Sequence, residues 1–309
     1  MLRVEGLPRV DERLLAGPTA VTVGVFDGMH RGHQALIARL CSVAQQRQAS
    51  TVVLTFRTHP DAYLRGTAPA PLMSLDNRLE GLERAGVDAC FVLDFDRSLM
   101  EMSAARFYDE VLIGGLGCVA LVFGYDAAIC RQREGTVERF RELGLDAERI
   151  DRLVVDGRAV SASAIREALG QGDLATATTM LGRPYSLRGL VVHGAARGRR
   201  IGFRTANVVV PDLCLPASGV YAVRATARDR GLDGADAVVN LGTRPTFGAS
   251  EQSLEVHVLD RDDLDLYGVE LQVDFLARIR AEQKFASEAA LTRQIQEDVA
   301  TARTWLARA

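Results

Sequence analysis

Residues 20–33 read Ala-Val-Thr-Val-Gly-Val-Phe-Asp-Gly-Met-His-Arg-Gly-His, and this stretch decides the fold of the first half of the chain. Its first seven residues form an apolar run that predicts a buried strand, and residues 33–46 follow with a helical apolar stripe. Between them, Gly28 and Gly32 let backbone amides approach a ligand closely, at a helix N-terminus that favours anions. The stretch therefore predicts a strand–loop–helix unit that binds phosphate.

Apolar runs and helical patterns continue to alternate through the first half. Further strands are expected at 51–56, 89–93, 119–123 and 152–155, and further helices at 75–85 and 103–112. Such alternation predicts an α/β fold with a parallel, doubly wound, Rossmann-like sheet. Ligands bind such sheets beyond the C-terminal ends of the strands, so the loops that follow the strands are the candidate sites.

The pattern changes near residue 183 to short β-rich runs separated by turns. Strands are expected at 187–193, 219–227, 237–241, 254–259 and 271–276. Their spacing predicts a compact antiparallel β-barrel, followed by a terminal helix from an N-cap at Ser287 to Leu306. Because 309 residues exceed one typical domain, we expect two domains, residues 1–183 and 184–309.

Composition restricts the classes of partner. The formal net charge of −3 argues against a nucleic-acid partner, which usually requires a basic face. No apolar run approaches the roughly 18–20 residues of a membrane span, and no signal peptide is recognisable. Five scattered cysteines without C-x-x-C spacing argue against a zinc site or a disulfide framework. We therefore expect a cytoplasmic protein without membrane or nucleic-acid partners, and leave a homo-oligomer open.

His30 and His33 are the first candidate catalytic residues. Their spacing of three lets both rings face one ligand at the start of a helix. Positioned donors of this kind stabilise the charge that develops on phosphorus during phosphoryl or nucleotidyl transfer. The alternatives are a tight turn with two incidental histidines, or a zinc pair, for which no third ligand is obvious.

Residues 24–33 resemble the G-x-F-D-G-x-H-x-G-H signature of the bacterial bifunctional riboflavin kinase/FAD synthetase family, whose members are HxGH nucleotidyltransferases. The resemblance extends over nearly the whole chain. It implies that the first domain transfers AMP from ATP to FMN and that the second phosphorylates riboflavin with ATP. It also implies that His30 and His33 contact the ATP phosphates at the reacting centre, and that Asp27 helps to organise the site or its metal. The other nucleotide-binding residues implied in this stretch are Gly24, Phe26, Gly28 and Gly32.

Two further motifs of the family are altered here. Its T-F-x-P-H-P becomes residues 55–60, Thr-Phe-Arg-Thr-His-Pro, which retain His59. Its G-x-D/N-F-x-F-G becomes residues 124–130, Gly-Tyr-Asp-Ala-Ala-Ile-Cys, which retain Asp126 but lose both aromatics. By resemblance, His59 and Asp126 contact the flavin. Cys130 stands in place of the final glycine, and its side chain can forbid a turn that needs a positive φ.

The S-S-T-x-x-R motif becomes residues 161–166, Ser-Ala-Ser-Ala-Ile-Arg. By resemblance, Ser163 and Arg166 bind the nucleotide, and Arg166 is available to the leaving pyrophosphate. The nucleotide residues are thus better retained than the acceptor residues. We therefore expect either a fully active FMN adenylyltransferase or one that is weak or altered in nucleotide or acceptor.

The second domain carries a glycine-rich basic segment. Residues 198–207 read Gly-Arg-Arg-Ile-Gly-Phe-Arg-Thr-Ala-Asn and resemble the family's kinase signature G-R-x-x-G-F-P-T-A-N, with arginine in place of proline. Alone, the segment is typical of a cationic surface turn. On a strand, Thr205 and Asn207 share one face and offer hard oxygen ligands suited to Mg²⁺. The resemblance further implies nucleotide binding by Gly198, Arg199, Gly202, Thr205 and Asn207.

Glu255 is the candidate base of the kinase. It alternates with apolar residues in Leu254-Glu255-Val256-His257-Val258, so it faces away from them on a strand. A surface glutamate is the plain alternative, but the resemblance implies that Glu255 accepts the proton of the riboflavin hydroxyl. Arg280, in a further matching segment, is implied to contact the flavin.

These features predict an ATP-dependent enzyme of flavin cofactor biosynthesis with riboflavin, FMN and ATP as ligands and Mg²⁺ as cofactor. One alternative keeps the kinase and gives the first domain a different nucleotidyl transfer or none. A second alternative is a flavin- or nucleotide-binding sensor without catalysis.

Overall fold

The computed structural model describes residues 1–9, 14–193, 203–246, 249–261 and 264–308. The chain divides into two compact units, residues 1–162 and 163–309, and each is described here by itself. The boundary expected from the sequence, between residues 183 and 184, falls just before the first barrel strand, which begins at Tyr185. The assignment of one function to residues 1–183 and another to 184–309 stays a prediction.

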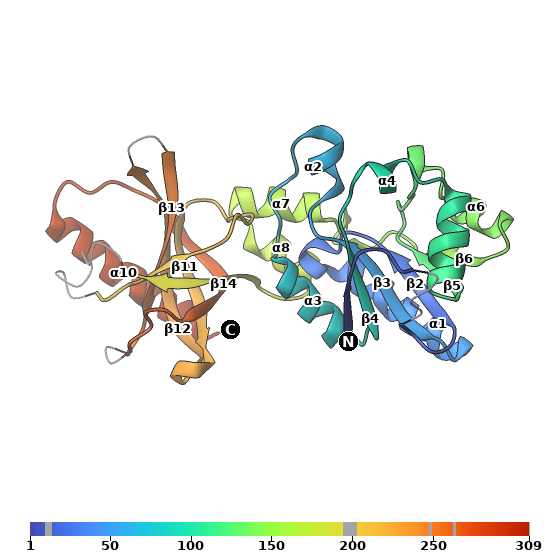
Figure 1. Ribbon diagram of the computed structural model, residues 1–309. Helices are drawn as coiled ribbons and strands as arrows, with labels where there is room; N and C mark the ends of the chain where they lie inside the picture. The colour runs from blue at the N-terminus through green and yellow to red at the C-terminus, as the bar shows by residue number, and fades with distance from the viewer. Residues whose placement is uncertain (10–13, 194–202, 247–248, 262–263, 309) are drawn as a thin grey trace. The chain divides into compact units, whose positions relative to one another are not determined.

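The first unit is built on a parallel sheet of six strands in the order β1-β4-β3-β2-β5-β6 (Figure 1). The strands are β1 (Leu2–Glu5), β2 (Thr19–Val23), β3 (Ser50–Phe56), β4 (Ala89–Leu93), β5 (Cys118–Phe123) and β6 (Asp146–Arg149). From β2 the chain builds outward through β3 and β4, and then returns to add β5 on the other side of β2. Ligands bind open α/β sheets at such a reversal, so the loops after β2 and β5 flank the expected site.

Helices cover both faces of this sheet. The helices of this unit are α1 (Arg31–Arg47), α2 (Pro60–Arg65), α3 (Leu75–Arg84), α4 (Arg97–Met100), α5 (Ala104–Arg106), the π-helix η2 (Phe107–Gly115) and α6 (Val137–Glu142), with 3₁₀ turns η1 (Asp27–Met29) and η3 (Arg131–Arg133). Neighbouring residues of a strand pack into separate hydrophobic cores on the two faces of the sheet. Val52 and Leu54 pack towards η2 and α6, whereas Val53 packs towards α1 and α3. This confirms the doubly wound fold. The helices expected at 33–46 and 75–85 are α1 and α3, and the one expected at 103–112 is α5 continued by the π-helix.

The expectation of a sheet strand at 152–155 is wrong. Residues 154 and 155 form β7 (Val154–Val155), which pairs only with β8 (Arg158–Ala159) in a small antiparallel hairpin. The last strand of the sheet is β6, and β1 at the other edge was not predicted at all. Both edge strands are four residues long, and the charged, half-exposed sequence of β6 has no apolar run to reveal it.

The second unit is a closed barrel preceded by the helices α7 (Ala162–Gln171) and α8 (Leu174–Leu181) and followed by α10 (Glu288–Leu306). Its strands are β9 (Tyr185–Val192), β10 (Ala206–Val209), β11 (Gly219–Ala227), β12 (Leu232–Thr246), β13 (Ala249–Val258) and β14 (Glu270–Ala281), with a 3₁₀ turn η4 (Arg228–Arg230). All six strands pair antiparallel, in the order β10-β13-β12-β11-β14-β9. The predicted antiparallel barrel is therefore confirmed.

Alternation along the strands fills the barrel and directs polar residues outward. Leu254, Val256 and Val258 are buried, whereas the intervening Glu255 and His257 are only half-buried. Closure also depends on Gly189, because a Cβ there would lie 2.2 Å from the carbonyl oxygen of Val209. A strand that crosses its neighbour this closely accepts only glycine.

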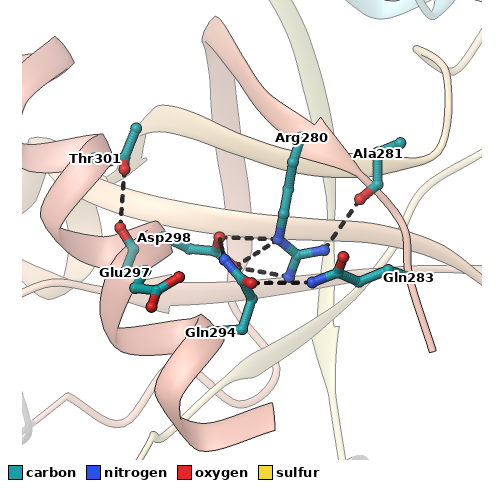
Figure 2. A network of polar contacts seen from close by, with 7 residues as sticks. All are labelled: Arg280, Ala281, Gln283, Gln294, Glu297, Asp298 and Thr301. Carbon is teal, nitrogen blue, oxygen red and sulfur yellow. Dashed lines mark hydrogen bonds and ion pairs between the residues drawn. The ribbon is translucent and has the colours of Figure 1, made fainter. Parts of the chain in front are cut away.

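The terminal helix α10 is fixed to the outside of the barrel. Ser287 caps it as predicted, with its Oγ accepting a hydrogen bond from the amide of Ala290 at 3.2 Å. Figure 2 shows the deeper anchor: Arg280 of β14 donates from Nε and Nη2 to the carboxylate of Asp298, at 2.9 and 2.7 Å. Gln294 donates to the same carboxylate at 3.1 Å.

Within the described residues, no helix combines the length and apolarity that crossing a bilayer requires.

Candidate active sites

The loop after β2 has an unusual backbone. Phe26, Gly28 and Met29 have φ values of 55°, 77° and 43°, so three of four consecutive residues are left-handed. Left-handed backbone is costly for residues other than glycine and persists where the surroundings enforce it, often at functional sites. Here the Phe26 ring is fully buried. The loop therefore presents its amides and the start of α1 at the end of β2, as the sequence predicted.

His30 and His33 lie together at the N-terminus of α1. His30 is the N-cap, and its Nδ1 accepts a hydrogen bond from the backbone amide of His33 at 3.2 Å. The two imidazole rings stack with centroids 3.6 Å apart. A Cβ on Gly32 would lie 3.2 Å from the His30 ring, so glycine leaves room for this arrangement. Since Nδ1 of His30 accepts, a neutral His30 carries its proton on Nε2.

Burial sets the charge of the second histidine. It lowers the pKa of His33 well below its ordinary value, and positive charge on His30 and Arg78 lowers this pKa further. Its Nδ1 is buried and has no hydrogen-bond partner among the described residues. His33 is therefore neutral near pH 7, and the pair presents polar N–H groups without two adjacent positive charges.

Asp27 ties the loop to a distant segment. Its side chain is 3% exposed, and its carboxylate accepts the backbone amide of Leu72 at 2.8 Å through Oδ1 and 3.1 Å through Oδ2. These contacts fit the organising role implied by the resemblance.

His59 and a group of aromatic rings follow β3 and β4 at the same edge of the sheet. His59 caps α2, with Nδ1 accepting the amide of Asp61 at 3.1 Å. The ring of Phe95 packs edge-on against Phe56 and Tyr63, with centroids 5.9 and 6.0 Å apart. Sequence reasoning missed this group, because Phe95 follows β4 and its neighbours follow or end β3.

The loop after β5 has a positive φ at Cys130, the position at which the family motif has glycine. Cys130 has a φ of 65°, so the side chain does not forbid the turn, contrary to the concern raised by the sequence. Ile129 and Gly135 close the loop by reciprocal backbone hydrogen bonds of 3.1 and 2.9 Å. Asp126 is exposed, and its carbonyl accepts a hydrogen bond from Arg133 at 2.9 Å.

Ser163 and Arg166 lie in the first turns of α7. Ser163 is exposed and Arg166 is half-buried, one turn further along. Both are grouped with the second unit, so their place relative to His30 and His33 stays a prediction.

In the barrel, two of the predicted kinase residues are brought side by side. Asn207 on β10 is the register partner of Glu255 on β13, and Glu255 is also the register partner of Asn240 on β12. Register partners project from the same face of a sheet with Cβ atoms about 4.5–5.5 Å apart. The three polar residues therefore form one row across three neighbouring strands, on the outer face of the barrel.

The chain around this row is partly described. Thr205 stands immediately before β10 and lines a shallow pocket with Val256 and Tyr267. Nδ1 of His257 is 2.8 Å from the carbonyl oxygen of Arg204, so this side chain ties β13 to the segment before β10. The predicted nucleotide residues Gly198, Arg199 and Gly202 lie outside the described residues.

Arg280 extends the same row. It pairs in register with Val220, which in turn pairs with Asn240. Its guanidinium is held by Asp298 and lies over the ring of Phe285, 5.6 Å from the centroid. The residue predicted to contact the flavin thus also anchors α10.

Two further residues escaped the sequence reasoning. Asn240 was not singled out from the sequence, and its place beside Glu255 follows from strand register. Arg78 occupies the apolar face of α3 with Leu79 and Leu82, and is 4% exposed. A charged residue inside an apolar stripe was the signal that could have identified it.

Comparisons with known proteins cover both units. A family model described as FAD synthetase matches residues 14–164, and one described as riboflavin kinase matches residues 181–306. The bifunctional riboflavin kinase/FMN adenylyltransferase of Haemophilus influenzae is 36% identical over 310 residues, covering 99% of this chain and 99% of that protein. Its namesake from Escherichia coli K12 is 38% identical over 289 residues, covering 92% of this chain and 91% of that protein.

A solved structure also matches over the full length. A chain titled macrolide-efflux protein, from Streptococcus pneumoniae, superposes with a TM-score of 0.90 at 29% identity and covers 99% of this chain and 100% of its own length.

Proposed function

The chain belongs to the family of bifunctional riboflavin kinases/FMN adenylyltransferases, and from this membership we propose that it performs both steps of flavin cofactor synthesis. It is an ATP-using enzyme of flavin biosynthesis. In the first step the 5′-hydroxyl of riboflavin attacks the γ-phosphorus of ATP, and FMN and ADP result. In the second, a phosphate oxygen of FMN attacks the α-phosphorus of another ATP, and FAD and pyrophosphate result.

The alignment of Asn207 with Glu255 carries the kinase proposal. Glu255 accepts the proton of the riboflavin hydroxyl as its oxygen bonds to the γ-phosphorus and the bond to the bridging oxygen of ADP breaks. In this proposal ATP binds on the side of the base where Asn207 and Thr205 lie. A sensor only binds its ligands and needs no base, so the alignment of a carboxylate with the amide side chain of Asn207 favours a catalytic role over a sensing role.

The donor set fits Mg²⁺. A threonine hydroxyl, an asparagine amide oxygen and a neighbouring carboxylate are hard oxygen ligands, and Mg²⁺ is usually held by few protein groups together with substrate phosphates. We propose that Thr205 and Asn207 hold it. When bound, the ion offsets the negative charge of the transferred phosphoryl group.

For adenylyl transfer we propose that His30 and His33 contact the phosphates of ATP. The Nε2 proton of His30 and the neutral ring of His33 provide hydrogen bonds to the oxygens on which charge develops as pyrophosphate leaves. Gly24, Gly28 and Gly32 allow the backbone to approach the nucleotide, and Phe26 and Asp27 fix the loop. Ser163 and Arg166 receive the leaving pyrophosphate.

His59 and Asp126 are proposed to contact the flavin of FMN, and Arg280 that of riboflavin. The rings of Phe56, Tyr63 and Phe95 offer the first unit an aromatic surface of the kind a flavin stacks on, despite the loss of both aromatics from the loop after β5. The retained φ of Cys130 favours a working acceptor site over an altered one. Location in the cytoplasm and an oligomeric state stay predictions.

Single-site variants test the assignment of the two activities. We expect Glu255→Gln to lower phosphorylation of riboflavin at least about 100-fold and to leave the formation of FAD from supplied FMN unchanged. We expect His30→Ala to give the opposite pattern. Glu270→Gln is the matched control, because Glu270 is exposed on another strand of the same barrel. Full kinase activity in Glu255→Gln would refute the base assignment.

A further inference from the structure

Arg78 lies beneath residues 24–30 of the first unit, the loop proposed to bind the ATP phosphates (the phosphate loop). It belongs to α3, whose Gly81 packs against Met29 of η1 so closely that a Cβ would lie 3.2 Å from the Met29 Cγ. The Arg78 side chain is 4% exposed, although α3 has an exposed face on which an arginine is easily solvated. Burial of its charge therefore costs free energy unless surrounding groups or a bound ligand pair with that charge.

A chain of hydrogen bonds links Arg78 to the loop. Nη1 of Arg78 donates to the carbonyl of Phe56 at 2.7 Å and to the hydroxyl of Thr55 at 3.2 Å. The Thr55 hydroxyl in turn donates to the carbonyl of Val25 at 3.2 Å. Arg78 thus holds the C-terminal end of β3, and through Thr55 it holds the loop that follows β2.

The charge of Arg78 is incompletely balanced. Both groups that accept its hydrogen bonds are neutral, and its buried Nε has no hydrogen-bond partner among the described residues. Burial lowers the pKa of the guanidinium, and the Asp27 carboxylate acts in the opposite direction but more weakly. Since arginine keeps its proton in proteins, a buried positive charge remains beside the loop. A polyanion bound at the loop would complete the balance.

We propose, on the basis of the adenylyltransferase function proposed above, that Arg78 is a positioning residue for the ATP triphosphate. It acts through Thr55 and Val25, which fix the loop at the end of β2, and its buried charge lies behind the histidine pair. Arg78 should therefore strengthen the binding of ATP as well as speed the transfer step, because both the loop and the charge are in place before the reaction. The triphosphate, not FMN, is the ligand whose binding depends on it.

The experiment compares steady-state kinetics of FAD formation by the full chain and its variants. We expect Arg78→Met to raise KM for ATP about tenfold or more, to lower kcat/KM for ATP about 100-fold and to leave KM for FMN within about twofold of wild type. Arg78→Lys retains the charge and a donor, so it should recover most of the loss. Riboflavin phosphorylation, measured on the same samples, should be unchanged.

Two further variants keep the test decisive if Arg78→Met folds poorly. Thr55→Val removes the hydroxyl but preserves the shape of the side chain, and should raise KM for ATP about threefold to tenfold. Arg84→Met is the matched control, because Arg84 lies on the same helix, is exposed and, among the described residues, bonds only the carbonyl of Glu80. It should match wild type.

The outcomes separate this proposal from the function on which it depends. If wild type forms FAD and Arg78→Met and Thr55→Val keep the wild-type KM for ATP, the positioning role is refuted and the adenylyltransferase stands. A fall in kcat with unchanged KM and no recovery in Arg78→Lys would likewise refute it, because it would report only fewer folded molecules. If wild type forms no FAD, the proposed adenylyltransferase fails, and the role of Arg78 fails with it.

Discussion

Asn207 and Glu255 stand directly opposite each other on β10 and β13, and the pairing places the proposed metal ligand beside the proposed base. They are 48 residues apart in the sequence, so only the closed antiparallel barrel brings them together. Because adjacent strands fix this pairing through backbone hydrogen bonds, the two side chains keep their spacing without a flexible loop between them. In the proposed kinase site, this pairing fixes the spacing between the base and the metal ligand.

Asn207→Ala should weaken the use of Mg²⁺ by the kinase. Loss of the amide oxygen leaves Thr205 as the only proposed protein ligand, so the Mg²⁺ concentration for half-maximal phosphorylation of riboflavin should rise about 10-fold to 100-fold. The measurement is a titration of initial rate against free Mg²⁺ at saturating ATP. Formation of FAD from FMN is the internal control, and an unchanged Mg²⁺ titration would remove Asn207 from the metal site.

Asp298→Ala should destabilise the barrel unit. It leaves the mostly buried Arg280 without its carboxylate, and the loss of one partner of such a pair costs about 3–5 kcal/mol in the free energy of unfolding. Chemical denaturation of the full chain would measure it. Arg303→Met breaks the exposed pair with Asp260 and is the control, with little change expected. A stability for Asp298→Ala equal to that of the control would contradict the anchoring role.

The same pair tests whether Arg280 contacts the flavin. If the guanidinium contacts both Asp298 and riboflavin, Arg280→Met should raise KM for riboflavin. The apolar double variant Arg280→Met/Asp298→Leu should not return this KM to the wild-type value, because it still lacks the guanidinium. The double variant should recover part of the lost stability, because it removes the unpaired charge. Equal KM values for riboflavin in wild type and in both variants would limit Arg280 to anchoring α10.

Cys130→Gly should be more stable than Cys130→Ala. Both variants lose the thiol, but alanine keeps the left-handed φ of 65° that costs a residue with a Cβ about 1 kcal/mol or more. Thermal unfolding of the two variants under identical conditions measures the difference. FAD formation should survive in both, since the loop already has this backbone. A more stable alanine variant would show that the conformation is not strained.

His33 should stay neutral as the pH falls through 6.5, its ordinary pKa. Because its folded pKa is lowered by burial, by His30 and by Arg78, the unfolded chain binds this proton more readily. His33 therefore contributes to a loss of stability as the pH falls below about 6.5. Histidine ring resonances in NMR spectra, assigned by comparison with His33→Gln, give the titration directly. A midpoint at or above 6.5 would contradict the burial argument.

The sequence predicted those parts of the fold where pattern and structure share one cause. The buried strands β2 to β5 consist mainly of apolar residues, and α10 shows both its N-cap and its stripe, so both were predictable. The edge strand β6 is not apolar, because one side of an edge strand has no neighbour to pack against, and it was missed. The hairpin at 154–159 was taken for a sheet strand because two valines resemble the start of an apolar run.

The sequence could predict which polar side chains lie together only where one segment carries them. His30 and His33 lie within one turn of helix, so their spacing alone places them together. Asn240 joins Glu255 through strand register, and Arg78 reaches the phosphate loop through Thr55 on another strand. Such relations depend on tertiary packing, which the order of residues in one chain does not display.

Product analysis by liquid chromatography and mass spectrometry tests the central claim most directly. The full chain is incubated with Mg²⁺, ATP and riboflavin, and separately with FMN and each of the four common ribonucleoside triphosphates. Two active sites predict FMN and then FAD from riboflavin, and FAD from FMN with ATP. FMN as the sole product would contradict the second activity, a dinucleotide made only from another triphosphate would contradict its specificity for ATP, and no phosphorylated flavin at all would contradict the whole account.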